Sequence, residues 1–240
     1  MLANGGKSVV GVASACACAG VITGVLSLTG LGGKIANVIL AVAQGKLLLA
    51  MIMVMLVCTI LGMGLPTTAS YIIASSVTAG PLITLGLSPL VANMFIFYYA
   101  CLSAITPPVA IAAYGAAGIA DCNASRAGFK AWWLGLVAFI VPYMFTFSPE
   151  LLLVSDRGPL YILYCVFTSC VGIWFFSYFI CGFFLGKKLS IFIRLLMLVG
   201  SLCMVAAGLM TDILGLALIA ACIAYQKFVE KRPAETAAAQ

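Results

Sequence analysis

Two short segments of this chain combine helix-breaking residues with side-chain hydroxyl groups, and they lie close together in the sequence. The candidate site residues are Gly62, Gly64, Pro66, Thr67, Thr68 and Ser70 in the first segment, and Ser103, Thr106, Pro107 and Pro108 in the second. Glycine and proline interrupt a helix and free backbone carbonyl oxygens from their intrahelical bonds. Carbonyl and hydroxyl oxygens suit a small cation, and the ends of interrupted helices add their dipoles. This pattern is typical of the binding sites of secondary transporters.

The composition indicates the environment in which these segments fold. The chain is 65% hydrophobic and only 8% charged, whereas soluble domains carry about 25% charged residues. Runs of about 20 apolar residues recur, and each can cross a hydrocarbon core about 30 Å thick. We therefore expect an all-α integral membrane protein with about six membrane-spanning helices, one re-entrant helical hairpin and two broken-helix sites.

The first break separates two apolar arms, Gly45 to Ile60 and Thr67 to Ala79. Neither arm is long enough to cross the bilayer comfortably. Two interpretations are open: a single span kinked at Pro66, or a re-entrant hairpin over residues 45–79 with its tip at Gly62 to Ser70. Gly80-Pro81 and Ser88-Pro89 would mark the return of the chain to the interface.

The second break lies inside the apolar segment 91–120. Thr106-Pro107-Pro108 separates Val91–Ala104 from Val109–Ala120, and two consecutive prolines remove two backbone donors. Proline kinks often only bend a membrane helix. Irregular backbone at membrane depth is nevertheless expensive unless it is buried in protein or lines a polar cavity, so two neighbouring breaks favour a binding site.

The remaining chain is read as further membrane segments. Before the first break we expect a span at Val9 to Leu28 and a short segment at Lys34 to Ala43. After the second break, the expected spans are Phe129 to Phe147, Leu160 to Leu185, Ser190 to Met210 and Ile213 to Tyr225. A tight turn at Thr211-Asp212 would join the last two. The predicted divisions are a transport repeat at 1–152, a C-terminal extension at 153–226 and a polar cytoplasmic tail at 227–240.

The basic residues predict the orientation. If residues 45–79 form a re-entrant hairpin, nine of the 12 basic residues fall on one side of the membrane. The three on the other side are Lys34, Lys46 and Arg157. Since the positive side is cytoplasmic, both termini are predicted in the cytoplasm, and the hairpin enters from outside.

Catalysis and metal binding by side chains are not expected. The chain has no histidine, no pair of carboxylates and no serine or cysteine beside an evident base, so acid–base catalysis lacks its usual groups. No acidic residue lies inside an apolar run before Asp212, which the pattern places at a turn. We therefore expect no enzyme activity, no cofactor, no nucleic-acid partner, no metal ion beyond a small cation at the two breaks and no proton relay built on carboxylates.

At the two breaks the sequence also resembles a known family. Leu61 to Tyr71 (LGMGLPTTASY) and Ala104 to Ala110 (AITPPVA) resemble the C-terminal half of the large membrane subunit of TRAP transporters, and are most similar to the fused permeases of the TAXI branch. Ala13 to Thr29, Ala112 to Ala120 and Ile140-Val141-Pro142 agree with this resemblance. The resemblance covers about residues 1–152.

The resemblance implies a mechanism and partners. Family members are sodium-driven importers of organic acids in the bacterial inner membrane, which receive substrate from a periplasmic solute-binding protein and move it by an elevator motion. By this analogy Gly62 to Ser70 is the tip of the second hairpin, and Thr106-Pro107-Pro108 is the unwound part of the following helix. The family's first hairpin and its broken helix have no counterpart here.

The missing repeat leaves two interpretations. The chain is expected to work with a chain or segment that carries the N-terminal repeat and with a small membrane subunit. The alternative is a non-transporting membrane scaffold or a truncated fragment of such a permease.

Overall fold

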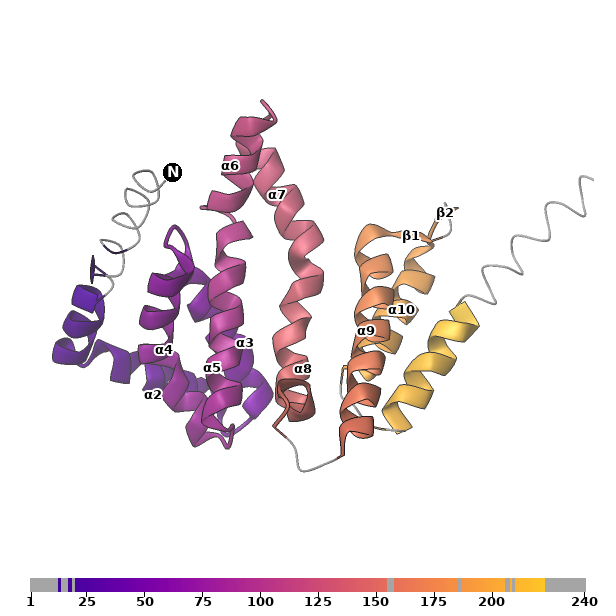
Figure 1. The fold of residues 1–240 in the computed structure, drawn as a ribbon, viewed down its shortest axis with the longest axis horizontal. Coiled ribbons are helices and arrows are strands. Elements are labelled where there is room, and N and C mark those ends of the chain that lie inside the picture. Colours follow the sequence, from indigo (N-terminus) through magenta and orange to yellow (C-terminus); the bar gives the residue numbers. More distant parts are fainter. Residues whose placement is uncertain are drawn as a thin grey trace, which may run out of the picture. The chain divides into compact units, whose positions relative to one another are not determined.

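The computed structural model describes residues 20–154, 158–184, 187–205 and 210–222, together with residues 13, 17, 18 and 208. Its described elements are helical, apart from two strands of two residues each. The chain divides into two compact units, Met1–Pro142 and Tyr143–Gln240, and Figure 1 shows the helices of each. The predicted divisions near residues 152 and 226 stay predictions.

The first unit begins with a sharply bent pair of helices. Helix Gly20–Thr29 meets α2 (Leu31–Ala43) at an angle of 72°. Gly30 allows the bend because its φ of 64° is left-handed, a conformation that glycine adopts without strain. The segment predicted at Lys34 to Ala43 is thus most of α2. Of the span predicted at Val9 to Leu28, the part from residue 20 to 28 is helical, and residues 9–12, 14–16 and 19 lie outside the described residues.

Helices α3 (Leu47–Gly62) and α4 (Thr67–Thr84) form a helical hairpin. The chain reverses between them, since Gly62 lies beside Ser70, and Cys58 Sγ lies 3.5 Å from Thr78 Oγ1. A single kinked helix would separate positions 58 and 78 by about 30 Å. The two arms predicted around the first break are therefore folded back on each other.

Helix α4 continues beyond the point where the sequence suggested an end. Gly80-Pro81 was expected to mark the return to the interface, but Pro81 lies inside the helix, which ends at Thr84. Proline removes one intrahelical bond and leaves the other bonds of the helix in place, so the arm predicted to end at Ala79 continues to Thr84. The return to the interface at Gly80-Pro81 stays a prediction. Ser88-Pro89 does begin a helix: Ser88 Oγ accepts from Val91 N, and Pro89 is the first residue of α5 (Pro89–Leu102).

Helical segments lie on both sides of the second break and continue to residue 147. A 3₁₀ turn, η1 (Ser103–Ile105), extends α5, and α6 (Ile111–Ile119) follows the break. Asn123 caps α7 (Ala124–Gly135) by accepting from Arg126 N. The 3₁₀ segment η2 (Leu136–Ile140) and α8 (Val141–Phe147) continue this direction to residue 147. The span predicted at Phe129 to Phe147 is thus part of a longer helical segment.

The second unit packs α9 against α10 and the last described helix. After the 3₁₀ turn η3 (Pro149–Leu152), α9 (Pro159–Cys181) is followed by strands β1 (Phe183–Phe184) and β2 (Lys187–Lys188), which pair antiparallel. Then come α10 (Ile191–Cys203) and helix Met210–Cys222. The tight turn predicted at Thr211-Asp212 was wrong, because both residues lie inside that last helix.

Glycine allows α10 and helix Met210–Cys222 to approach closely. A Cβ atom on Gly215 would lie 2.7 Å from both Gly200 O and Met204 Cγ. Small residues at helix interfaces permit such close packing in lipid, where large apolar side chains gain nothing by facing inward. Gly215 therefore permits the close approach of these two helices.

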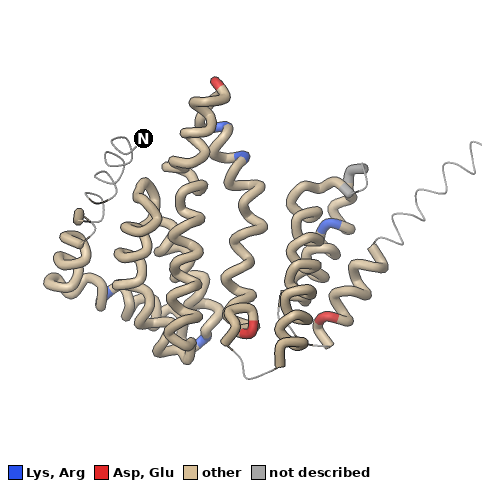
Figure 2. The backbone as a smooth tube through the Cα atoms, viewed as in Figure 1, with Lys and Arg blue, Asp and Glu red and all other residues tan. Residues whose placement is uncertain are grey.

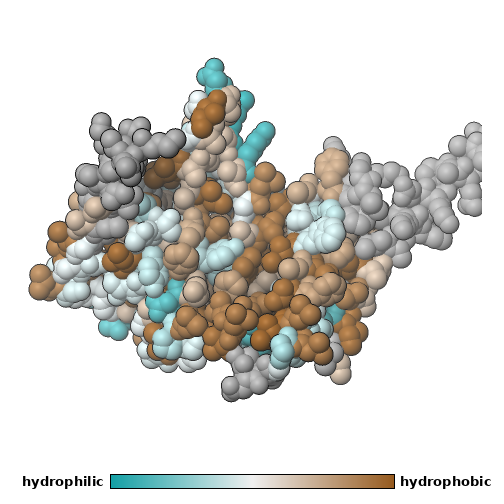
Figure 3. Space-filling model, viewed as in Figure 1, coloured by the Kyte–Doolittle hydropathy of each residue, from teal (hydrophilic) through white to brown (hydrophobic). Residues whose placement is uncertain are grey.

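The described helices support a membrane-embedded protein. Ala124–Phe147 and Pro159–Cys181 are long and apolar enough to cross a membrane, and the bent pair around Gly30 would make a third span. The expected six spans are thus not all present as long helices among the described residues. Large apolar side chains are exposed, for example Leu28 at 91% and Leu160 at 81%, and hydrophobic residues dominate the visible surface in Figure 3.

Charged residues in the first unit gather at its ends. In Figure 2 the basic residues of α7 lie near the tip where α6 and α7 meet, whereas those of α2 and the α2–α3 link lie at the opposite end. The same α6–α7 tip is hydrophilic in Figure 3. This arrangement agrees with the predicted separation of Arg126 and Lys130 from Lys34 and Lys46.

Candidate functional site

The first break is a four-residue link between α3 and α4. Helix α3 ends at Gly62, and its last turn is closed by bonds from Met63 N to Ile60 O and from Leu65 N to Gly62 O, both 3.3 Å long. Gly64 has a φ of +82°, which a residue with a side chain rarely adopts. Pro66 then precedes the first residue of α4, with its fixed φ suited to the start of a helix. Glycine and proline therefore make the reversal possible.

The second break separates η1 from α6. Thr106 is extended, with φ −94° and ψ 126°, and its Oγ1 donates to Leu102 O over 2.9 Å. Pro107 and Pro108 follow, joined by a cis peptide bond. The hydroxyl of Tyr114 donates to Pro108 O. One freed carbonyl is thus satisfied by a side chain of the next helix.

A hydrogen bond joins the two breaks. Ser103 Oγ lies 3.0 Å from Gly62 O and 2.7 Å from Ala100 O, so its single proton is shared between two carbonyl acceptors. Ser103 is fully buried. The last carbonyl oxygen of α3, Gly62 O, has no partner within its own helix. It therefore accepts a hydrogen bond from Ser103, which follows the end of α5.

Gly62 is closely surrounded by hydroxyl groups. A Cβ atom at this position would lie 2.6 Å from Ser103 Oγ, and still closer to Ser70 Oγ. Gly64 lies near the second break as well, since its Cβ would be 3.4 Å from Val109 Cγ1. The absence of a side chain at Gly62 allows three polar groups to converge: its own carbonyl oxygen and the hydroxyls of Ser70 and Ser103.

Ser70 supplies the one unsatisfied polar atom of this cluster. The residue is 0% exposed, and its Oγ has no hydrogen-bond partner. A buried hydroxyl without a partner loses the bonds it would make in water. Its lone pairs are free to bind a small cation, beside a helix C-terminal carbonyl that also attracts positive charge.

The predicted site residues divide into two groups. The buried group is Gly62, Ser70, Ser103 and Thr106, which the fold brings to the junction of the two breaks. Thr67 and Pro107 are half-buried. The exposed group is Gly64, Pro66, Thr68 and Pro108. Gly64, Pro66 and Pro108 shape the two turns and Thr68 lies in the first turn of α4, whereas the buried residues provide oxygen atoms.

An open cavity of about 520 Å³ lies beside the second break. Its described lining is Thr106, Pro107, Pro108, Tyr114, Ser125, Phe129 and Trp132. Helices α6 and α7 supply an aromatic wall of this cavity that was not predicted from the sequence. The spacing of Ser125, Phe129 and Trp132 on one face of a helix is a signal for it. A cavity of this size can hold a small solute.

The comparisons with known proteins agree with these features. Residues 1–156 match the family model described as the DctM component of the tripartite ATP-independent periplasmic transporter. The matched region includes both breaks and the helices on either side of them. No curated protein and no solved structure matches the chain.

Proposed function

Because the chain belongs to the DctM family of tripartite ATP-independent periplasmic transporters, we propose that it forms part of a sodium-driven permease that imports an organic acid. DctM is a family of membrane components of transporters. The sequence around both breaks resembles this family, and the resemblance implies Na⁺ as the coupling ion and an organic acid as the substrate. The TAXI branch remains the specific type that we propose.

The unsatisfied hydroxyl of Ser70 carries this proposal. It is buried beside Gly62, next to the position that a Cβ atom of this residue would take, and Ser103 Oγ borders the same position. Ser70, Gly62 and Ser103 belong to three segments that meet at the two breaks. Neutral oxygens from unwound helix ends are the ligands that secondary transporters use for Na⁺. We assign Na⁺ to this junction, with Ser70 Oγ as one ligand.

The proposed transport mechanism uses the hairpin and the broken helix together. Helices α3 and α4 would enter the membrane from the outside as a re-entrant hairpin, and Thr106-Pro107-Pro108 would face its tip. The junction would form one half of the sodium and substrate site and would move as one body in an elevator motion. The bond between Ser103 and Gly62 supports such joint movement because it ties the two breaks.

The other half of the site would come from a partner. We propose a chain or segment that carries the N-terminal repeat, a small membrane subunit and a periplasmic solute-binding protein that delivers the organic acid. The complex would lie in the bacterial inner membrane, with both ends of this chain in the cytoplasm. The separation of basic residues to opposite ends of the first unit supports this orientation.

Uptake into proteoliposomes tests the assignment of Na⁺. The chain is reconstituted with these partners, and uptake of labelled organic acids is measured against sodium concentration. Ser70→Ala is expected to raise the sodium concentration for half-maximal uptake by about tenfold, which corresponds to ~1.4 kcal/mol of binding energy. Ser75→Ala is the matched control, since Ser75 lies on the same helix and its hydroxyl donates to Ile72 O over 3.2 Å.

A second pair of variants tests the broken helix. Thr106→Ala and Thr84→Ala remove the same kind of hydrogen bond, because each threonine donates to the carbonyl four residues earlier over 2.9 Å. Thr106 borders the cavity and Thr84 lies exposed at the far end of α4. Only Thr106→Ala should abolish uptake. The proposed function would be refuted if uptake did not depend on the sodium gradient, or if Thr106→Ala and Thr84→Ala reduced uptake equally.

A further inference from the structure

The second unit is basic at the end where α9 is followed by the two strands. Between Gly158 and Thr211 the sequence contains three charged residues, and all of them are basic: Lys187, Lys188 and Arg194. The two lysines form β2, which pairs with β1 directly after α9, and Arg194 lies in the first turn of α10. Three positive charges therefore lie close together at one end of an apolar unit.

The guanidinium group of Arg194 is held in place by the last turn of α9. Its Nη2 atom donates to Phe179 O over 2.8 Å and to Ile180 O over 3.3 Å, and its Nε atom donates to Phe179 O over 3.1 Å. The carbonyl oxygens at a helix C-terminus repel an anion. Because Arg194 covers two of them, an anion can approach this end of α9, and the Nη1 atom lies outside these bonds.

The strands bring the two lysines near this guanidinium group. A Cβ atom on Gly182 would lie 3.0 Å from Arg194 Cζ and 3.1 Å from its Nη1, so the guanidinium lies against this glycine. The carbonyl oxygen of Gly182 accepts from Leu189 N over 2.9 Å, and Leu189 directly follows β2. The backbone of the lysine pair therefore begins one residue from the glycine that Arg194 contacts.

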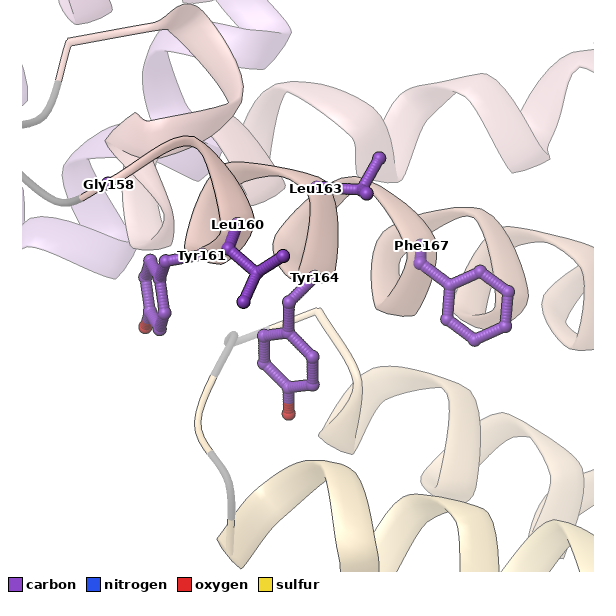
Figure 4. Close-up of a pocket in the computed structure, with 6 residues that line it drawn as sticks. All are labelled: Gly158, Leu160, Tyr161, Leu163, Tyr164 and Phe167. Carbon is purple, nitrogen blue, oxygen red and sulfur yellow. The ribbon is translucent and has the colours of Figure 1, made fainter.

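The acidic residues described in this unit lie elsewhere. In Figure 2, Glu150 and Asp212 lie at the opposite end of the unit from Arg194. Asp212 accepts a hydrogen bond from Tyr164, and Figure 4 shows Tyr164 reaching from the first turns of α9 toward the last described helix. Residues 223–240, which lie outside the described part of the chain, carry three basic and two acidic side chains in the sequence. They do not reverse the positive balance.

An exposed apolar face of α10 begins at the same basic end. Its members are between 46% and 75% exposed and share one side of the helix: Ile191, Phe192, Leu195, Val199 and Leu202. The rise from the first to the last of them is about 16 Å, and the hydrocarbon core of a bilayer is about 30 Å thick. The apolar face therefore matches the depth of one lipid leaflet.

A lipid with a negative headgroup fits both parts of this surface. Guanidinium and ammonium groups donate to phosphate oxygens, and an acyl chain can lie against exposed apolar side chains. A soluble anion would use only the basic part, and the positive group of a zwitterionic lipid would be repelled. We propose that this end of the second unit binds an anionic phospholipid, with its headgroup at Arg194 and β2 and an acyl chain along α10. The site lies outside residues 1–156, so it does not depend on the proposed uptake function.

Thermal unfolding of the whole chain in detergent tests this inference. Phosphatidylglycerol and phosphatidylcholine with identical acyl chains are titrated separately, and the lipid concentration that gives half of the shift in the unfolding midpoint is measured. We expect phosphatidylglycerol to act at about a tenfold lower concentration, as a few charge contacts allow. Equal concentrations for the two lipids would refute the site. An equal effect of soluble glycerol phosphate would also refute it, because the acyl chain would then have no role.

A double variant tests the basic part while it leaves the contacts of Arg194 in place. Lys187→Gln combined with Lys188→Gln should reduce the preference for phosphatidylglycerol from about tenfold to about twofold, since two of three positive charges are lost. The control is Lys34→Gln combined with Lys46→Gln, which removes the same charge from exposed positions of the first unit and should keep the full preference. An equal loss in both double variants, or no loss in the first, would contradict a localised site.

A variant of α10 tests the apolar part. Val199→Ser should raise the half-effective concentration of both lipids and leave their ratio unchanged, because it touches the acyl chain and not the headgroup. Val38→Ser is the matched control, since Val38 is 55% exposed and Val199 is 51% exposed. If Val199→Ser and Val38→Ser behaved alike, the acyl chain would not lie along α10.

Arg194→Gln completes the test of the headgroup contacts. It should remove most of the preference for phosphatidylglycerol and also lower the unfolding midpoint in the absence of lipid, because the carbonyl oxygens at the end of α9 lose their donor. A full preference retained in Arg194→Gln would refute the assigned headgroup position.

Discussion

Ser103 Oγ lies 3.0 Å from the carbonyl oxygen of Gly62, a residue 41 positions earlier in the chain. This contact joins the end of α5 to the end of α3 and so connects the two helix breaks. It is a long-range polar contact inside an apolar unit, where a lost partner is not replaced by water.

Replacing Ser103 by alanine should weaken the junction. The variant leaves Gly62 O with the backbone donor Leu65 N but without a side-chain donor, and the loss of one intramolecular hydrogen bond costs about 0.5–1.5 kcal/mol. We expect a lower thermal unfolding midpoint for the purified chain in detergent and reduced sodium-dependent uptake in the reconstituted complex. Ser177→Ala is the control: Ser177 donates only to Trp174 O of its own helix. Equal midpoints for the two variants would contradict the role given to Ser103.

A methyl group at position 62 should be more damaging than the loss of one hydrogen bond. The Cβ of Gly62→Ala would overlap both hydroxyl groups that lie beside Gly62, and overpacking in a filled interior costs about 1–3 kcal/mol. Circular dichroism during heating should show early loss of helix. Gly115→Ala is the matched control, because a Cβ at Gly115 meets nothing within 4 Å. If the thermal unfolding midpoint of Gly62→Ala were equal to or higher than that of Gly115→Ala, the junction would be able to accommodate a methyl group.

The turn at Gly64 should discriminate between substitutions by backbone conformation. Its φ of +82° makes alanine unfavourable by about 1–2 kcal/mol, whereas asparagine tolerates left-handed backbone better. Gly64→Ala should therefore reduce both the unfolding midpoint and uptake, and Gly64→Asn should reduce them less. If the order of the two variants were reversed, side-chain crowding near Val109 would be the dominant effect.

The second unit offers a test of close helix packing. Gly215→Val should separate helix Met210–Cys222 from α10, because even a Cβ atom would lie 2.7 Å from Gly200 O. We expect faster proteolysis of the unit in detergent. Gly118→Val provides the same change at a helical site with nothing within 4 Å of its Cβ. Identical digestion of the two variants would mean that these helices do not depend on the glycine contact.

Arg194 should stabilise the C-terminal end of α9 through geometry as well as charge. Its guanidinium reaches two carbonyl oxygens and lies 5.8 Å from the centre of the Phe179 ring. Lysine keeps the charge but loses the planar set of donors. Arg194→Lys should therefore lower the thermal midpoint of the chain by less than Arg194→Met. Equal midpoints for Lys and Met would assign the effect to geometry alone.

The sequence predicted the breaks because their cause is local. Gly64 and Pro66 disrupt a helix wherever they occur, and Pro107-Pro108 removes two adjacent donors. The same local rule failed at Gly80-Pro81, where the packing of α4 maintains the helix through Pro81. A separate expectation, that polar residues mark a turn, failed at Thr211-Asp212: both residues lie inside helix Met210–Cys222, where Asp212 accepts a hydrogen bond from Tyr164 of α9.

The parts of the site that the sequence could not predict depend on tertiary contacts. Ser70 and Ser103 were both candidates, but nothing in their spacing indicates that one donates to Gly62 while the other has no partner. The cavity wall formed by Phe129 and Trp132 requires α7 to lie against the second break. Such relationships follow from how the helices pack, which periodicity alone does not determine.

The close packing around Gly62 restricts which substitutions this junction can accept during evolution. Any heavier residue at position 62 meets two hydroxyl groups at once, so trimming Ser70 or Ser103 singly leaves the other obstruction in place. Alanine at both positions would still leave the Cβ atom of residue 103 at 2.8 Å from a Cβ atom on residue 62, so a bulkier residue at position 62 also needs a shift of the backbone. We expect related chains that share this junction to keep all three residues small or to exchange them together.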